Sequence, residues 1–273
     1  MATQFEIDCA LMAGGAYLSN RSEKNKFPVP QGWIPVPGSH VEGSMGFEAV
    51  SFRRGTEIVI SFAGTNFDPL STDGLGDIAA DLTLALGQTS EQLVQAARYY
   101  LDIKAANPGA VISFTGHSLG GGLAALMAVL FDEPAITFDQ APFAASVTVN
   151  TQQDLLSALG EAGYTPAQLQ ALAPELLDFQ GSARAGNVTN LFVDGELLHT
   201  GFIAALFPSQ SFLGAQAAVR QGSGDTVSAT DLHSQALLAA FLQSEGFRQS
   251  TYQLSDLLKR GDLAVNVAWR VAT

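Results

Sequence analysis

The sequence predicts an α/β fold, in which a mostly parallel central sheet is covered by helices on both faces. Three observations predict it. Short apolar stretches alternate with helical patterns along much of the chain. The stretch over residues 58–62 is almost continuously apolar, which is typical of a strand buried on both sides. Charged residues make up only 14% of the 273 residues, well below the usual fraction of about 25%, which favours a large core.

The first part of the chain predicts a helix, a long loop and a hairpin. The helix is expected over residues 10–19, and the loop, rich in proline and glycine, over residues 20–46. Two runs rich in β-branched and aromatic residues then flank a turn at Arg54-Gly55, which is typical of a β-hairpin. We expect its strands at Phe47–Arg53 and Glu57–Ala63.

Helices and strands alternate after the hairpin. A helix is expected over residues 90–106, beginning at a Ser90 cap and ending before Asn107-Pro108-Gly109. Residues 141–187 interrupt the alternation with two predicted helices, the second opened by Thr165-Pro166. We interpret them as a helical insertion in one domain spanning 1–273, since about 45 residues are few for independent folding. The other expected elements are strands Val111–Thr115, Ala135–Phe138 and Val188–Val193 and helices Leu119–Phe131 and 234–243.

The strongest chemical signal is the segment Gly116-His117-Ser118-Leu119-Gly120. It matches G-x-S-x-G and lies between a predicted buried strand and a predicted helix, which is the context that a nucleophile elbow requires. Glycines two residues before and after the serine allow the strand and the helix to approach closely. The motif therefore predicts Ser118 as a nucleophile on an α/β-hydrolase fold.

A nucleophilic serine needs a general base, and the chain has four histidines. In this fold the order along the chain is serine, acid, histidine. His40 precedes the serine, and the side chain of His117 is expected to point away from it. Of the two that follow, His233 at the start of a predicted helix is favoured over His199.

The predicted acid and oxyanion donors come from the ends of strands. Asp194 follows Val188–Val193 and is the expected orienting acid, with Asp139 as its rival. The tetrahedral intermediate needs two donors, and the backbone N–H of Leu119 is one of them. We expect Thr65, at the end of the preceding buried strand, to supply the other.

These residues make the sequence resemble the class 3 lipases, the family of fungal triacylglycerol lipases and their bacterial relatives. Residues 58–65 resemble the family's strand ending in Gly-Thr, and residues 114–121 resemble its nucleophile elbow. The resemblance covers residues 47–145, and beyond them Asp194 and His233 by order. It implies an α/β-hydrolase that cleaves the acyl esters of glycerolipids through an acyl-enzyme on Ser118.

The resemblance leaves the substrate open. A phospholipase and an esterase for short-chain or polymeric esters remain alternatives, as does a non-catalytic ligand-binding module of the same fold. Residues 141–187 and 196–230 are expected to build the acyl pocket, and either 66–76 or 202–219 could form a lid. The expected partner is a lipid or another ester substrate at an interface.

Composition excludes several classes of protein. The net charge of −13 argues against nucleic-acid binding. It also argues against electrostatic docking on anionic membranes, so any lipid contact must be apolar. The single cysteine, Cys9, permits no intrachain disulfide and is expected to be a buried core residue. No cofactor or metal motif is evident. The acidic loops could still bind a structural calcium. No integral membrane segment is expected. Glu6 and Asp8 lie where a signal peptide would be basic, so none is expected. Because the disulfides and signal of the secreted fungal relatives are absent, the resemblance implies a bacterial enzyme that is either intracellular or secreted without an N-terminal signal.

Overall fold

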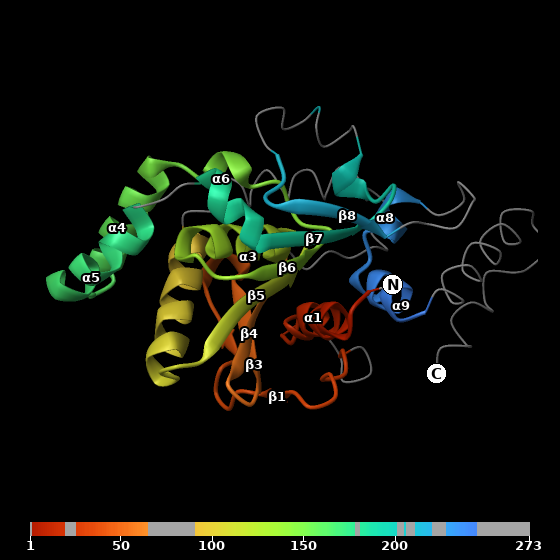
Figure 1. Ribbon diagram of the computed structural model, residues 1–273, viewed down its shortest axis with the longest axis horizontal. Helices are drawn as coiled ribbons and strands as arrows, with labels where there is room; N and C mark the ends of the chain where they lie inside the picture. Colours follow the sequence, from red (N-terminus) through yellow and green to blue (C-terminus); the bar gives the residue numbers. More distant parts are fainter. Residues whose placement is uncertain are drawn as a thin grey trace, which may run out of the picture.

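The computed structural model describes residues 2–19, 26–64, 91–177, 181–200, 205, 211–219 and 228–244. Within them, eight strands form one sheet in the order β1-β3-β4-β5-β6-β7-β8, and β2 also pairs with β3 (Figure 1). Strands β4 to β8 are parallel, whereas β1, β2 and β4 run antiparallel to β3. The strands are β1 Ile34–Pro35, β2 Val41–Glu42, β3 Glu48–Arg54, β4 Glu57–Phe62, β5 Val111–His117, β6 Ala135–Phe138, β7 Val188–Val193 and β8 Ala215–Val219.

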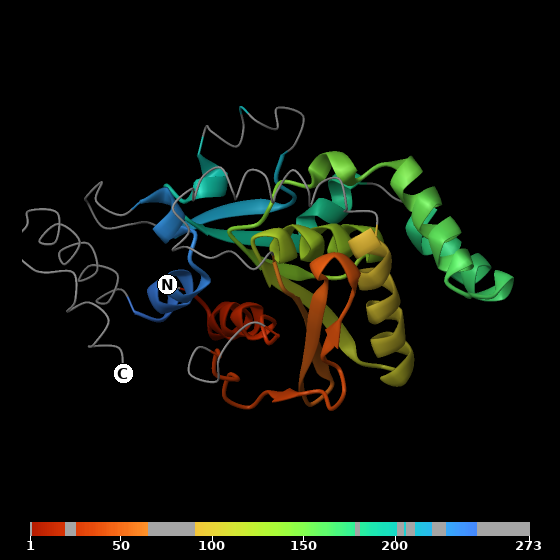
Figure 2. The same ribbon diagram turned by 180° about the vertical axis from the view of Figure 1, so that it is seen from behind.

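Helices cover both faces of this sheet, as predicted (Figures 1 and 2). Helix α3 (Leu119–Phe131) and the helix over residues 91–106 pack on one face, and α1 (Gln4–Gly15) and α9 (Gln235–Gln243) on the other. Neighbouring side chains of β4 point to opposite faces, so Ile58 and Ile60 join the first cluster while Val59 joins the second. The predicted mostly parallel sheet, buried on both sides, is therefore confirmed.

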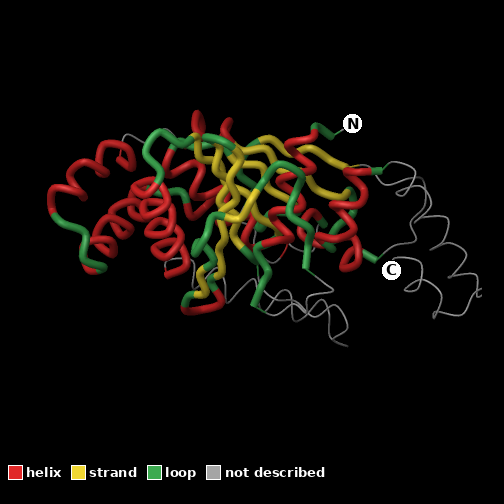
Figure 3. The backbone as a smooth tube through the Cα atoms, turned by 90° about the horizontal axis from the view of Figure 1, so that it is seen from below, coloured by secondary structure: helices red, strands yellow, loops and turns green. Residues whose placement is uncertain are grey.

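Three helices separate β6 from β7, where the sequence predicts an insertion. They are α4 (Val149–Glu161), α5 (Pro166–Leu177) and the short α6 (Gly181–Arg184). Helices α4 and α5 form a hairpin at one end of the molecule, on the side away from α9 (Figures 1 and 3). Their buried leucines join the same core as α3: Leu155, Leu159, Leu172 and Leu176.

The first helix departs from its prediction because of its cap. Helix α1 begins at Gln4 instead of residue 10, since Thr3 and Glu6 form a reciprocal capping box at its start. It ends at Gly15 instead of residue 19.

Three short strands were also missed. Strands β1 and β2 lie inside the predicted loop over residues 20–46, at the edge of the sheet, where a proline in a strand is tolerated. Strand β8, with the sequence AQAAV, completes the parallel sheet although it contains one β-branched residue.

Candidate active site

Ser118 lies at the sharp turn between β5 and α3. Its backbone has φ 57° and ψ −124°, a conformation that L-residues rarely adopt. Its N–H donates to the carbonyl of Phe138 at 3.0 Å, and its own carbonyl accepts from Gly122 and Ala141. These bonds hold the strained turn in place, and the side chain of Ser118 stands at the N-terminus of α3.

The two motif glycines are required by close backbone contact. A Cβ atom on Gly116 would lie 2.4 Å from the carbonyl oxygen of Gly120. One on Gly120 would lie 2.3 Å from the carbonyl oxygen of Phe62 in the neighbouring strand β4. Since both neighbours are backbone atoms, no side-chain movement can relieve either contact.

His233 contacts Ser118, as the sequence predicts. Its Nε2 lies 2.9 Å from Ser118 Oγ, and its Nδ1 lies 2.6 Å from Glu196 Oε2. Because an ionised carboxylate only accepts, Nδ1–H donates to Glu196 and Nε2 is left to accept from the serine hydroxyl. His233 lies between α8 (Ala229–Leu232) and α9, 115 residues after the serine in the chain.

The predicted acid is wrong in its position by two residues. Asp194 directly follows β7 and has an exposed side chain, whereas the carboxylate bonded to His233 belongs to Glu196, which is fully buried. Gly195, at φ 85°, turns the chain between the two acids. The apolar pair Leu197-Leu198 that follows is buried, and its burial places the adjacent Glu196 in the interior. This apolar flank is the one signal in the sequence that distinguishes Glu196 from Asp194.

Donors surround the carboxylate of Glu196. The backbone N–H groups of Leu198 and His199 each donate at 2.8 Å, and His199 Nδ1 makes a further short hydrogen bond to Oε1. Burial alone would raise the pKa of Glu196, but the charge of His233 and the hydrogen bonds from His199 and His233 outweigh it and lower the pKa to about 2. Glu196 is therefore ionised across the physiological range and can stabilise an imidazolium at His233.

His199, the rival base, supports the acid instead of the serine. Its ring is stacked between Phe192 and Phe212, with centroid distances of 3.8 and 4.0 Å. Its Nε2 lies 3.2 Å from Gln216 Oε1 on β8. Stacking between the two phenylalanines fixes the His199 ring, which is hydrogen-bonded to Glu196.

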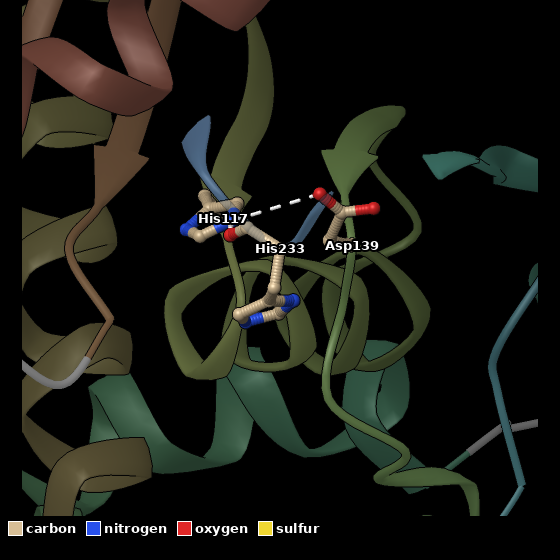
Figure 4. A group of neighbouring side chains, drawn as sticks. All are labelled: His117, Asp139 and His233. Atoms are coloured by element: carbon tan, nitrogen blue, oxygen red, sulfur yellow. Dashed lines mark hydrogen bonds and ion pairs between the residues drawn. The ribbon is translucent and has the colours of Figure 1, made fainter. Parts of the chain in front are cut away.

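Asp139, the rival acid, lies next to His117. Its Oδ1 accepts from the Val193 N–H at 2.9 Å, while its Oδ2 lies 3.8 Å from His117 Nε2 (Figure 4). Burial and the nearby charge of Glu196 raise its pKa well above the usual range, against the hydrogen bond from Val193. The protonated form of Asp139 is thus favoured next to His117, and the partner of His233 Nδ1 is Glu196 instead.

The oxyanion donors are described only in part. Leu119 begins α3 directly after Ser118, so its N–H lies at the positive end of the helix. The backbone of Gly64 lies against it, since a Cβ on Gly64 would be 3.3 Å from the Leu119 nitrogen. Thr65, the other predicted donor, lies outside the described residues.

Two other residues considered from the sequence, His40 and Cys9, lie outside the Ser118 site. His40 lies at the sheet edge, 2.8 Å from Glu48, and Cys9 is buried with its pKa raised by burial. The first lid candidate lies outside the described residues, and of the second only 205 and 211–219 are described. In the part of the chain that the structure describes, no helix is long and apolar enough to cross a membrane.

Two groups of described residues gather three side chains that could bind a metal ion: His117, Asp139 and His233, and His40, Glu42 and Glu48. In the first, both ring nitrogens of His233 already have partners. In the second, Glu48 accepts from His40 and from the backbone of Leu18. The expectation that the enzyme needs no metal stays a prediction.

The fold and this site define a class: an α/β-hydrolase with a serine at its nucleophile elbow and an imidazole and a carboxylate in line behind it. A family model described as a Tle-like phospholipase domain of the phospholipase-like family matches residues 31–240. The chain belongs to this family.

Individual proteins match this chain over a smaller part of its length or at low sequence identity. The chain is 34% identical over 105 residues to an extracellular phospholipase A1 of Serratia liquefaciens, a match that covers 38% of this chain and 30% of that protein. Lipase II from Rhizopus niveus aligns over 81% of this chain and 83% of its own, at 13% identity and a TM-score of 0.45. A deletion mutant of the Rhizomucor miehei lipase propeptide complex aligns over 87% and 78%, at 15% identity and a TM-score of 0.43.

Proposed function

We propose that this protein hydrolyses the acyl esters of glycerophospholipids through an acyl-enzyme on Ser118. The observation that carries the proposal is the chain of hydrogen bonds from Ser118 Oγ through His233 to Glu196, at 2.9 and 2.6 Å. A strained serine with a buried imidazole and an ionised carboxylate behind it is suited to nucleophilic attack on an ester carbonyl.

The roles of the residues follow from their positions. Ser118 Oγ attacks the carbonyl carbon while His233 Nε2 takes its proton, and Glu196 stabilises the imidazolium that forms. His233 then gives the proton to the leaving alcohol oxygen. Water attacks the acyl-enzyme with the same base, releasing the fatty acid and restoring Ser118. The Leu119 N–H is placed to donate to the oxyanion, and we assign Thr65 as the second donor.

Two findings favour phospholipid over triacylglycerol. The family that contains this chain is described as phospholipase-like, and the Serratia relative is named a phospholipase A1. The shared chemistry is an acyl ester on glycerol, so triacylglycerol and short soluble esters are the comparison substrates. The partner is a lipid surface, and neither a cofactor nor a metal enters the reaction steps.

The substrate is tested by fatty-acid release from phosphatidylcholine vesicles, emulsified triolein and p-nitrophenyl butyrate, each with and without a chelator. We expect release from the vesicles to exceed release from triolein and to survive the chelator. Ser118→Ala should abolish release and labelling by a fluorophosphonate probe. Full activity of Ser118→Ala would overturn the mechanism, and a preference for triolein would overturn the substrate.

The acid is tested by a matched pair of variants. Glu196→Gln keeps the shape of the side chain but removes the charge facing His233, so kcat should fall by about 10³- to 10⁴-fold. Asp194→Asn changes an exposed carboxylate two residues away and should leave kcat unchanged. The opposite result would return the role to Asp194. Circular dichroism of both variants controls for folding.

A further inference from the structure

His117, the first of the two variable residues of the G-x-S-x-G motif, contacts the backbone of His233, the histidine bonded to Ser118. Its Nε2 lies 2.9 Å from the carbonyl oxygen of His233. The two rings lie side by side, with centroids 4.8 Å apart, although the residues are 116 positions apart in the chain (Figure 4). Both side chains are buried.

The partners of His117 fix which nitrogen carries the proton. A carbonyl oxygen only accepts, so Nε2 must be protonated and donates to His233. In the neutral ring, Nδ1 then accepts, and the hydroxyl of Tyr17 lies 3.3 Å from it. Asp139 Oδ2, at 3.8 Å from Nε2, is beyond hydrogen-bonding distance. The imidazole of His117 therefore links Tyr17, two residues after the end of α1, to the loop between α8 and α9.

The loop between α8 and α9 is short, and this link adds to the other bonds that hold it, such as the one from the Ser234 N–H to the Asp231 carbonyl at 3.1 Å. The N–H of His233 is bound by the preceding turn, to the carbonyls of Ala229 and Thr230 at 3.2 Å. Its carbonyl is bound by a side chain of the nucleophile elbow itself. The peptide group after His233 is thus anchored to the same turn that carries Ser118.

We infer that His117 is a positioning residue, which with Tyr17 holds the backbone of His233 so that its ring stays in register with Ser118. The inference rests on the proposed function. A shift of about 1 Å between reacting groups can lower a rate by ~10²-fold, so a single anchor of this kind matters for kcat. Substrate binding does not depend on it, and KM is expected to stay unchanged.

Three substitutions separate the hydrogen bond from packing. His117→Gln places an amide nitrogen the same number of bonds from Cα as Nε2, so it can still donate to His233. His117→Asn places its nitrogen at the position of Nδ1, too short to reach. His117→Phe keeps a ring and removes both nitrogens. We expect kcat to fall by about 10- to 100-fold in the Asn and Phe variants, to stay close to wild type in the Gln variant, and KM to stay constant in all three.

Tyr17→Phe tests the outer half of the link. It removes the hydroxyl that faces Nδ1 and keeps the ring, so the carbonyl of His233 keeps its donor. We expect a smaller loss of kcat than in His117→Phe. An equal or larger loss would show that the order of the link is wrong.

A spectroscopic readout keeps the test independent of turnover. The Nδ1 proton of His233, held between two heavy atoms 2.6 Å apart, should give a low-field resonance in protein with ¹⁵N-labelled histidine. It should persist in His117→Gln and broaden in the Asn and Phe variants, with thermal unfolding confirming that each is folded. Equal kcat in all three variants, or an unchanged resonance in Asn and Phe, would overturn the inference. If the wild-type protein itself is neither active nor labelled at Ser118, the proposed function fails instead.

Discussion

Two buried carboxyl groups near His233 have opposite protonation states for identifiable reasons. Glu196 receives hydrogen bonds from two imidazoles and two backbone N–H groups, and its pKa falls to about 2. Asp139 is equally buried, but among the described residues it receives one N–H, from Val193, and its other oxygen has no hydrogen-bond partner there. The negative charge of Glu196 further favours the protonated form of Asp139, whose pKa is raised. Of these two carboxyl groups, the one favoured as an anion is therefore Glu196, which contacts His233.

This difference predicts how stability changes with pH in Asp139→Asn. Above the unfolded value of about 3.9, the unfolded chain releases the Asp139 proton while the folded protein keeps it. The stability contributed by neutral Asp139 is thus fully present below that value and is lost as pH rises toward the folded pKa. Asparagine cannot ionise, and its oxygen can still accept from Val193. The variant should gain stability over wild type as pH rises above the unfolded value, until the folded pKa is reached, by up to about 1.4 kcal/mol per pH unit.

Urea unfolding of both proteins at pH 5, 6, 7 and 8 measures this difference. Glu196 adds no slope in that range, because its lowered pKa keeps it ionised in the folded state and it is mostly ionised when unfolded. A difference between the proteins that stays constant over the range would show that Asp139 is ionised in the fold.

At the scale of the elements, the site depends on how closely β4, β5 and α3 approach each other. Glycine at 116 and 120 lets the backbone of α3 rest on the ends of both strands, and this contact forces the strained φ of Ser118. In Gly120→Ala the new Cβ would lie 2.3 Å from a backbone oxygen, so strand and helix must separate. We expect the free energy of unfolding to fall by about 3 kcal/mol, the upper end for overpacking, with loss of activity.

Gly186→Ala is the matched control for this substitution. In the part of the chain that the structure describes, no atom lies within 4 Å of a Cβ built there, and its φ is outside the left-handed region. Its stability should stay within about 0.5 kcal/mol of wild type. Chemical denaturation of both variants decides the matter: equal stabilities would contradict the close-contact argument.

The elements also show what a sequence can and cannot predict here. Ser118 was predictable because its motif needs a strand, a turn and a helix in a fixed order. His233 was predictable because chain order excluded His40 and the start of a predicted helix favoured His233 over His199. Glu196 was not, since Asp194 satisfies the same rule. The turn at Gly195 and the buried pair Leu197-Leu198 after it together place Glu196 inward. Strand β8 has no strong pattern of its own; pairing with β7 makes it a strand.

At the scale of the whole molecule, the net charge of −13 sets how the protein meets a lipid surface. Repulsion from anionic lipid acts over about 30 Å at 0.01 M salt and about 8 Å at 0.15 M. Raising the salt between these values should therefore speed fatty-acid release from phosphatidylglycerol vesicles and change release from phosphatidylcholine little. Hydrolysis of p-nitrophenyl butyrate, which needs no surface, is the control and should not respond. A slower rate on the anionic vesicles at higher salt would mean that a basic patch, and not apolar contact, brings the enzyme to the membrane.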